Sequence, residues 1–404
     1  KVCPDMQRLM ARKDKVIQDQ AKGIIKLLNH HKIRHLKGYA YIEDANLVKI
    51  KLPDHKVLEI PWEKLILAVG SHPLSLPSFP FDGKMILSSN DALCLNEIPG
   101  SLMIVGGGVI GCEFAFIFAA LGSQVVVVEA LSRLLPLPSV DENCSKVLQR
   151  EMKKRKIKVM INRTVEMVEG KGSRCHVTIG PAPIDTEQKK QSLKPQKVEV
   201  EKVLVCVGRR PNTANLGLKK LGVKTDHNGW IMADELMETS VPEVYAIGDV
   251  LGPPKVMLAH VASAEGSVAA ENAVGGNHKM NYNIVPGAIF TMPEVANVGL
   301  TEAQARERGH NVRADTVLFR NMAKAQVIGE IAGEAKIVSD SENGRVLGVH
   351  IIGPHATDLI AEGTLVVQMG CTVKDLAETI HAHPTLAEII MEASFKALYR
   401  GLHG

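Results

Sequence analysis

A histidine and a glutamate near the C-terminus have the types and the spacing of an acid–base pair. They lie in the run His381-Ala382-His383-Pro384-Thr385-Leu386-Ala387-Glu388. A carboxylate that hydrogen-bonds to one ring nitrogen of an imidazole fixes its tautomer and raises the basicity of the other nitrogen. Such a base can take a proton from a thiol or hydroxyl. The spacing alone is weak evidence, because a histidine near a glutamate is often an ordinary surface or core pair.

A glycine-rich run, Gly106-Gly107-Gly108-Val109-Ile110-Gly111, matches the pattern G-x-G-x-x-G. It follows a strand predicted over residues 102–105 and precedes a helix predicted over 113–121. The next predicted strand, 124–129, ends on Glu129. A strand, a glycine turn, a helix and an acidic residue after the next strand form the context that dinucleotide binding requires.

Each residue of this fingerprint has a physical role. Gly106 permits the tight turn, Gly108 lets the backbone approach a pyrophosphate, and Gly111 lets the helix and strand pack closely. The helix N-terminus favours the phosphate charge. Glu129 would bond the ribose 2′-hydroxyl and repel a 2′-phosphate, so we expect NAD rather than NADP.

Two further strands end on glycine, at Val69-Gly70 and at Val207-Gly208, and suit a backbone that crosses close to a dinucleotide. Gly248-Asp249 ends another apolar strand and could present a carboxylate to a ribitol or ribose hydroxyl. Taken alone, each of the first two is better explained as an ordinary turn, and Gly248-Asp249 is equally compatible with a turn that Asp249 caps.

Apolar periodicity predicts the elements that position these residues. Helices are predicted over residues 12–30, 141–156, 259–273, 356–369, 373–379 and 386–398. Further strands are predicted over 33–36, 47–50, 64–71, 203–208 and 244–249, with a hairpin of 335–338 and 346–352. The segment 170–200 is rich in Lys, Gln and Pro, and is predicted to be an exposed hairpin loop.

Composition excludes several classes of protein. The net charge of +4 over 404 residues is too mild and dispersed to suggest nucleic-acid binding. No apolar stretch approaches the roughly 20 residues of a membrane helix. The seven cysteines are scattered without a C-x-x-C spacing, which suits a reducing compartment. We expect the cytoplasm, with the mitochondrial matrix as the alternative.

Taken together, the motifs resemble the pyridine nucleotide–disulfide oxidoreductases over the whole chain. The resemblance rests on the glycine run, Glu129, residues 207–212, 239–249, 257–260 with 265–266, and 381–388. It implies an α/β fold with two Rossmann-like dinucleotide-binding domains, the first incomplete, and a C-terminal α+β interface domain for dimerisation. The implied limits are 1–74 (remnant of the FAD-binding domain), 75–225 (NAD-binding domain), 226–283 (central domain completing the FAD site) and 284–404 (interface domain).

The resemblance also implies an activity. It is strongest to members that reoxidise protein-bound dihydrolipoamide with NAD+ through a redox disulfide and FAD. His383 would be the acid/base and Glu388 its orienting partner, and the pair would reach the partner subunit's disulfide in a homodimer. His381 would be supporting. Partners would be lipoyl domains of 2-oxoacid dehydrogenase complexes or the glycine cleavage H protein, with no nucleic acid, membrane or metal.

The residues that the resemblance assigns to cofactors fall into two sets. For FAD they are Gly38, Val69, Gly70, Ser71, Asp249, Met257, Leu258, Ala259 and His260. For NAD they are Gly106, Gly108, Gly111, Glu113, Glu129, Val165 and Gly208, with Glu113 near the nicotinamide.

The sequence departs from the family in one respect, since it contains neither the first G-x-G-x-x-G nor a C-x-x-x-x-C pair. We expect it to be part of a longer enzyme, inactive alone, rather than a naturally truncated homologue. Three other functions stay open. One is another reductase of the mercuric or glutathione type, the second is a non-catalytic NAD-binding fragment, and the third is an NADH oxidase-like enzyme. Members of the third class usually lack the His-Pro…Glu pair.

Overall fold

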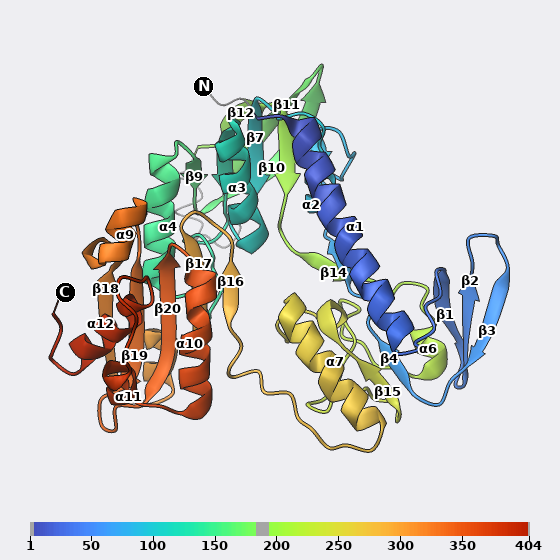
Figure 1. Cartoon of the computed structure of the whole chain (residues 1–404). Coiled ribbons are helices and arrows are strands. Elements are labelled where there is room, and N and C mark those ends of the chain that lie inside the picture. The colour runs from blue at the N-terminus through green and yellow to red at the C-terminus, as the bar shows by residue number, and fades with distance from the viewer. Residues whose placement is uncertain (1–3, 183–193, 403–404) are drawn as a thin grey trace. The chain divides into compact units, whose positions relative to one another are not determined.

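The computed structural model of the chain describes residues 4–182 and 194–402. Contacts divide the chain into two compact units, and most of their elements are labelled in Figure 1. The first unit contains Lys1–Leu74 and Gly208–Tyr282, and the second contains Ser75–Val207 and Asn283–Gly404. Each unit therefore joins stretches that are distant in the sequence. The mixture of helices and strands confirms the predicted α/β class.

The first unit begins with the long helix α1, Met6–His30. Its N-terminus is capped by Asp5, whose side chain accepts a hydrogen bond from the Arg8 N–H at 3.0 Å. The predicted helix 12–30 is confirmed and extends back to this cap. The predicted strand 33–36 is wrong, because these residues have no regular structure. Ile33 is 52% exposed, so the segment lacks the buried face that a strand needs.

Short strands, two α-helices and one 3-10 helix complete the described part of the first unit. The antiparallel strands are β1 (Tyr39–Asp44), β2 (Leu47–Lys51) and β3 (Val57–Pro61). A parallel pair is made by β4 (Leu65–Leu67) and β15 (Val244–Ala246), and an antiparallel pair by β5 (Ser71–Pro73) and β14 (Arg209–Pro211). The remaining elements are α6 (Leu218–Leu221), η1 (Gly248–Leu251) and α7 (Ala259–Ala273). The predicted helix 259–273 is confirmed. The predicted strand 64–71 is divided in two at Gly70, whose φ is +66° and does not suit a strand.

A five-stranded parallel sheet forms one part of the second unit, with the order β6-β13-β7-β8-β9. Its strands are β6 (Ile86–Leu87), β7 (Ser101–Val105), β8 (Gln124–Val128), β9 (Lys158–Met160) and β13 (Lys202–Val205), and its helices are α2 (Ser89–Ala92), α3 (Val109–Leu121) and α4 (Glu142–Lys154). Residues 102–105 are all buried, because a parallel sheet is covered on both faces. The predicted strand, glycine turn, helix and strand over 102–129 are confirmed.

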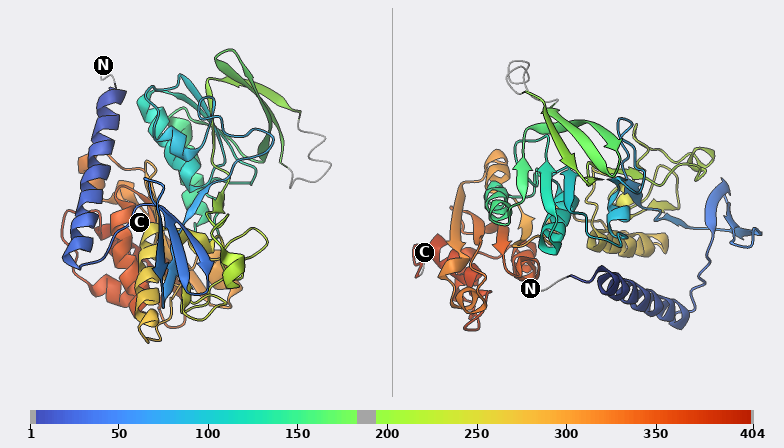
Figure 2. Two further views of the ribbon diagram at one scale, coloured as in Figure 1. Left: turned by 90° about the vertical axis from the view of Figure 1, so that its right-hand side faces the viewer. Right: turned by 90° about the horizontal axis from the view of Figure 1, so that it is seen from above.

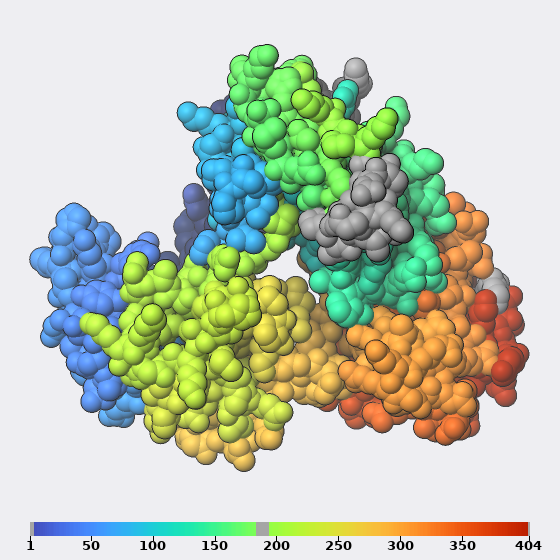
Figure 3. Space-filling view, turned by 180° about the vertical axis from the view of Figure 1, so that it is seen from behind, coloured from blue at the N-terminus to red at the C-terminus, as the bar shows by residue number. Residues whose placement is uncertain are grey.

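A three-stranded antiparallel sheet corrects the prediction for residues 170–200. It consists of β10 (Arg163–Lys171), β11 (Arg174–Pro181) and β12 (Gln196–Val200), and its outer surface is green in Figure 3. In β11, Cys175, Val177 and Ile179 are buried while the residues between them are more open. This period of two belongs to a half-buried strand, but the polar composition concealed it. Part of the predicted loop, residues 183–193, lies outside the described residues.

The C-terminal part of the second unit is an antiparallel sheet with helices on it, shown in two further views in Figure 2. The strand order is β16-β17-β20-β19-β18. The strands are β16 (Gly287–Ile289), β17 (Glu294–Gly299), β18 (Val312–Leu318), β19 (Glu334–Asp340) and β20 (Val346–Gly353). The helices are α8 (Glu302–Glu307), η2 (Phe319–Asn321), α9 (Ala323–Ile328), α10 (Ala356–Met369), α11 (Val373–Glu378) and α12 (Glu388–Ala397). The predicted hairpin and the last three predicted helices are confirmed.

Side chains alternate between the two faces of this sheet. Ile337, Val349 and Ile351 pack in the core with α10 and α12. Lys336 and Ile352 point to the opposite face, toward Asp141 and the core of the parallel sheet. The sheet is therefore covered on both faces, which explains why β20 is buried throughout.

Residues 208–225, which were predicted to belong to the NAD-binding domain, group with the first unit. Among residues 4–182 and 194–402, no helix is both long enough and apolar enough to cross a membrane.

Candidate active site

The glycine turn joins β7 to α3 in the second unit. A Cβ at Gly106, where φ is +105°, would collide with the carbonyl oxygen of Cys206, and a Cβ at Gly111 would collide with the carbonyl oxygen of Gly106. A Cβ at Gly108, the N-cap of α3, would meet nothing within 4 Å. The backbone is thus tightly packed on one side and open on the other, at the positive end of a helix. A pyrophosphate fits this arrangement.

Glu129 lies directly beside this turn and is 7% exposed. Its carboxylate accepts hydrogen bonds from the N–H of Gly107 at 2.5 Å and from the N–H of Leu131 at 2.7 Å. A carboxylate offers about four acceptor sites, so both oxygens can still accept from a ribose hydroxyl. The structure therefore brings Glu129 and the glycine turn together, as the sequence pattern predicts.

The other residues predicted for NAD occupy different settings. The Glu113 carboxylate, in the first turns of α3, accepts a hydrogen bond from the Phe290 N–H at 2.9 Å. Burial raises the pKa of Glu113, and this hydrogen bond offsets part of the rise. The Val165 side chain is buried in the core, and its backbone pairs with Ile179 of β11. Gly208 belongs to the first unit, where its carbonyl accepts from the Leu74 N–H at 3.0 Å.

Three polar side chains form a cluster in the first unit. The Ser71 hydroxyl donates to Asp249 Oδ2 at 2.8 Å, and Arg209 Nε donates to the Ser71 hydroxyl at 2.6 Å. Arg209 Nε also lies 3.5 Å from Asp249 Oδ2. Ser71 and Asp249 were both predicted to line FAD. Arg209 was missed, and the signal that could have found it is its position directly after a strand ending on glycine.

The turn before Ser71 is held by Asn212. The Asn212 side-chain amide donates to the Val69 carbonyl at 2.8 Å, and its backbone N–H donates to the Gly70 carbonyl at 3.0 Å. A Cβ at Gly70 would meet nothing within 4 Å, so this backbone is open to close approach. Gly38 is different, because a Cβ there would lie 2.6 Å from Ile50 Cγ2. Gly38 therefore packs against β2.

The turn that carries Asp249 is fixed by a buried carboxylate. Glu265 accepts from the Gly248 N–H at 2.6 Å and from the Tyr282 hydroxyl at 2.6 Å. Burial raises the pKa of Tyr282, and its hydrogen bond to Glu265 raises it further. Glu265 belongs to α7. The predicted FAD residues next to the N-terminus of this helix are Met257, Leu258, Ala259 and His260.

The predicted acid–base pair is formed in the structure. His383 Nδ1 lies 2.9 Å from Glu388 Oε1, and the other oxygen of Glu388 accepts from the Thr385 N–H at 2.8 Å. The His383 side chain is 71% exposed and the Glu388 side chain 16%. Burial raises the pKa of Glu388, but hydrogen bonds from Thr385 and His383 outweigh it, and the pKa lies below its usual range. The ionised carboxylate orients the ring and leaves Nε2 facing outward.

A second histidine–carboxylate pair lies two residues earlier. His381 Nε2 lies 2.8 Å from Glu362 Oε1, and His381 Nδ1 lies 2.9 Å from the Thr379 carbonyl oxygen. The His381 side chain is 6% exposed. Sequence reasoning missed Glu362, which lies on α10, because no local pattern relates it to His381.

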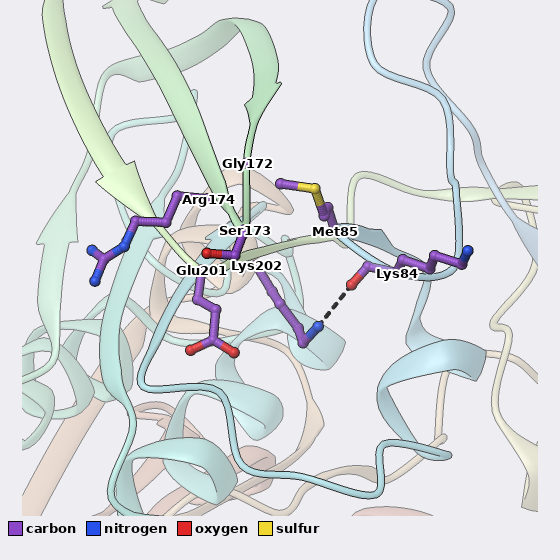
Figure 4. Close-up of a pocket in the computed structure, with 7 residues that line it drawn as sticks. All are labelled: Lys84, Met85, Gly172, Ser173, Arg174, Glu201 and Lys202. Carbon is purple, nitrogen blue, oxygen red and sulfur yellow. Dashed lines mark hydrogen bonds between the residues drawn. The ribbon is translucent and has the colours of Figure 1, made fainter.

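The cavity in Figure 4 lies at the other end of the parallel sheet from the glycine turn. Its volume is about 440 Å³, and its lining residues are Lys84, Met85, Gly172, Ser173, Arg174, Glu201 and Lys202. Lys202 pairs with Leu102 at the start of β7, whereas Gly106 follows the end of that strand. Ligands of parallel sheets bind at the carboxyl ends of the strands. The Lys202 amine donates to the Lys84 carbonyl at 2.8 Å, which is a structural contact.

In the part of the chain that the structure describes, no three His, Cys, Asp or Glu side chains come together as metal ligands. The six cysteines of that part are free thiols.

Comparison with known families gives two matches that together cover most of the chain. A family described as pyridine nucleotide-disulphide oxidoreductase matches residues 3–266. The dimerisation domain of the same family matches residues 285–394.

Similar proteins of known name agree with these matches. The dihydrolipoyl dehydrogenase of Chlamydia muridarum is 40% identical, with 99% of this chain and 82% of that protein covered. That of Thermus scotoductus is 39% identical, with 98% and 82% covered. The mitochondrial dihydrolipoyl dehydrogenase 1 of Arabidopsis thaliana is 36% identical, with 99% and 76% covered.

Two solved structures are similar along almost the whole chain. LpdA from Mycobacterium tuberculosis has a TM-score of 0.88 at 27% identity, with 98% of this chain and 84% of that chain covered. The HOCl-induced flavoprotein disulfide reductase RclA from Escherichia coli has a TM-score of 0.84 at 25% identity, with 97% and 86% covered.

Proposed function

Because the chain belongs to the pyridine nucleotide-disulphide oxidoreductase family, we propose that it acts as a dihydrolipoyl dehydrogenase. The net reaction oxidises a protein-bound dihydrolipoyl dithiol to the cyclic disulfide and reduces NAD+ to NADH, with release of one proton. The names of its relatives support this substrate.

The observation that carries the proposal is the hydrogen-bonded pair of His383 and Glu388. Their 2.9 Å contact places the Nδ1 proton on the carboxylate side and leaves Nε2 as the base. Nε2 takes the proton of a substrate thiol, and the resulting thiolate is the reactive nucleophile. The ionised Glu388 stabilises the imidazolium that forms. No two cysteines of the sequence have the C-x-x-x-x-C spacing, so the enzyme's redox disulfide is assigned to no residue here.

The residues present fit NAD and the part of FAD that meets the Gly70 turn and Asp249, while the first G-x-G-x-x-G is not in this sequence. The open backbone at Gly108 and the neighbouring Glu129 would hold the pyrophosphate and ribose of NAD. The open turn at Gly70 and the Asp249 carboxylate would hold FAD. When bound, the flavin and the nicotinamide carry electron pairs between the thiols and NAD+. We propose that the other residues predicted for FAD and for NAD contact the same two cofactors.

The proposed partners follow from the same family membership. The C-terminal part of the chain matches a dimerisation domain, which supports a homodimer. We propose that His383 meets the disulfide of the partner subunit, and that the substrates are lipoyl domains of 2-oxoacid dehydrogenase complexes or the glycine cleavage H protein. The expected compartment is the cytoplasm.

The test compares two reactions of the full-length holoenzyme. A His383→Gln variant is expected to lower dihydrolipoamide-dependent NAD+ reduction by about 10²- to 10⁴-fold, while electron transfer from NADH to a dye is retained. His355→Gln is the matched control, since His355 pairs with Asp358 on the surface of the same domain. Full thiol activity in His383→Gln, or equal loss of both reactions, would refute the role. A visible absorption spectrum of the purified protein tests for bound flavin.

A further inference from the structure

His381 is anchored at both of its ring nitrogens, although its neighbours in the chain are exposed. Ile380 is 96% exposed and the His383 side chain 71%, whereas the His381 side chain is 6% exposed. Its two partners come from different places. Thr379 precedes it in the chain, and Glu362 belongs to the long helix α10.

The types of these partners determine where the protons are. A carbonyl oxygen only accepts, so the Nδ1 that faces Thr379 carries a hydrogen. A hydrogen bond between Nε2 and the Glu362 carboxyl requires one more proton, held by either atom. The pair then has no net charge, whether it is written as imidazolium with carboxylate or as imidazole with carboxylic acid. Without that proton, two lone pairs would face each other at 2.8 Å.

The segment from His381 to Glu388 is therefore held at both ends. At one end, the Glu362 contact attaches His381 to α10. At the other end, Glu388 at the start of α12 accepts from His383 and from the Thr385 N–H. Between these ends, the Thr385 hydroxyl donates to the Ala382 carbonyl at 2.8 Å. Glu388 orients the His383 ring and holds the backbone on the C-terminal side of His383, at Thr385, whereas the Glu362 contact holds the N-terminal side, at His381.

We propose that Glu362 and His381 are positioning residues, which hold the His383 backbone at the place from which its Nε2 reaches the thiol. This inference rests on the proposed function, because it takes His383 as the base. It assigns Glu362 a part in the thiol reaction that no local sequence pattern indicates. Neither Glu362 nor His381 has to touch the substrate.

The first test removes the bridge and then restores it with a neutral side chain. Glu362→Ala leaves His381 Nε2 buried without its partner. Glu362→Gln can donate an amide N–H to Nε2 of a neutral ring, which keeps both hydrogen bonds and zero net charge. Asp358→Asn is the matched control, because it removes the carboxylate of an exposed histidine pair on the same helix.

In the holoenzyme, Glu362→Ala is expected to lower kcat for dihydrolipoamide about tenfold to a hundredfold, because a base displaced by about 1 Å loses its alignment. KM for NAD+ and the NADH-to-dye rate should stay unchanged, and Glu362→Gln should restore most of kcat. If Glu362→Ala fails to fold, the Glu362→Ala/His381→Ala double variant leaves no unpaired buried group and should show the same loss of kcat.

Three results would overturn the inference. They are unchanged kcat in the variants that lack the bridge, equal loss in Glu362→Gln and Glu362→Ala, or a parallel fall of the dye reaction. The His383→Gln variant separates this failure from failure of the proposed function. If His383→Gln loses thiol activity and Glu362→Ala does not, only the positioning role is wrong. If His383→Gln keeps full thiol activity, the proposed function itself is wrong.

Discussion

Lys336 and Asp141 form an ion pair inside the second unit, with 2.7 Å between Nζ and Oδ1 and with side chains only 8% and 6% exposed. Lys336 lies on β19 and Asp141 caps α4. Burial raises the pKa of Asp141, but the hydrogen bond from Lys336 and the nearby His350 outweigh it, and the pKa lies below its usual range. The pair thus joins the parallel sheet's helical layer to the C-terminal sheet through two ionised groups.

Asp141→Asn is expected to lower the free energy of unfolding by about 3 kcal/mol, because the buried Lys336 ammonium keeps only the more distant Glu302 carboxylate, 3.9 Å away, as a counter-charge. Asparagine caps helices as well as aspartate does, so the cap of α4 is kept. Urea denaturation monitored by circular dichroism measures the change. The Asp141→Asn/Lys336→Met double variant is the control and should recover much of the loss. A single variant as stable as wild type would contradict this account.

His350 lies beside this pair and predicts a pH dependence. Its Nε2 lies 2.9 Å from the Leu300 carbonyl oxygen, and its Nδ1 has no hydrogen-bond partner among the described residues. Burial lowers the pKa of His350, and the Leu300 contact offsets part of the effect. The unfolded chain therefore takes up a proton at higher pH than the folded protein does. This contribution to stability is complete at pH values above the pKa of the histidine in the unfolded chain. It is lost as the pH falls toward the pKa of His350 in the folded protein.

The urea midpoint is accordingly expected to fall between about pH 7 and about pH 5, around the ordinary histidine pKa of about 6.5. His350→Gln can still donate to Leu300 but does not titrate, so its midpoint should fall less over this range. Equal slopes in the two proteins would assign the pH dependence to another group.

Gly108→Ala is expected to weaken NADH binding without weakening the fold. The Gly108 φ of −73° suits alanine, and its Cβ would enter the open space where we place the pyrophosphate. Inserting an extra methyl group into a filled space costs about 1–3 kcal/mol, so KM for NADH should rise roughly tenfold. The melting temperature should stay unchanged. Gly106→Ala is the contrasting control, since its Cβ would collide with Cys206 and should lower the melting temperature. Unchanged KM in Gly108→Ala would exclude this side of the turn as the pyrophosphate site.

Glu388→Gln is expected to slow the thiol reaction about tenfold to a hundredfold, because a hydrogen bond to a charged partner contributes about 1.5–3 kcal/mol. The carboxylate is ionised at neutral pH because its pKa lies below the usual range. Its loss removes the charge that stabilises the His383 imidazolium. The NADH-to-dye rate serves as the internal control. A variant with wild-type thiol activity would show that Glu388 only shapes the loop.

Much of the site was predictable because it depends on neighbours in the chain. The glycine turn is recognisable because the positive φ of Gly106 and the close approach of Gly111 to the Gly106 carbonyl both lie within one strand, turn and helix. His383 and Glu388 are recognisable because a short loop and a helix N-terminus bring them together. The helices 259–273 and 356–369 agree with α7 and α10 because local periodicity specifies a helix.

What the sequence by itself determined is therefore the order of elements, the dinucleotide turn and the paired base. Only the tertiary structure decided the strands within 170–200, the Arg209 cluster and the Glu362 contact. These depend on pairing between residues far apart in the chain, where register and burial follow from packing rather than from local pattern. In the sequence, Glu362 looks like any polar residue of a helix. It anchors His381 only because folding brings α10 and the loop after α11 side by side.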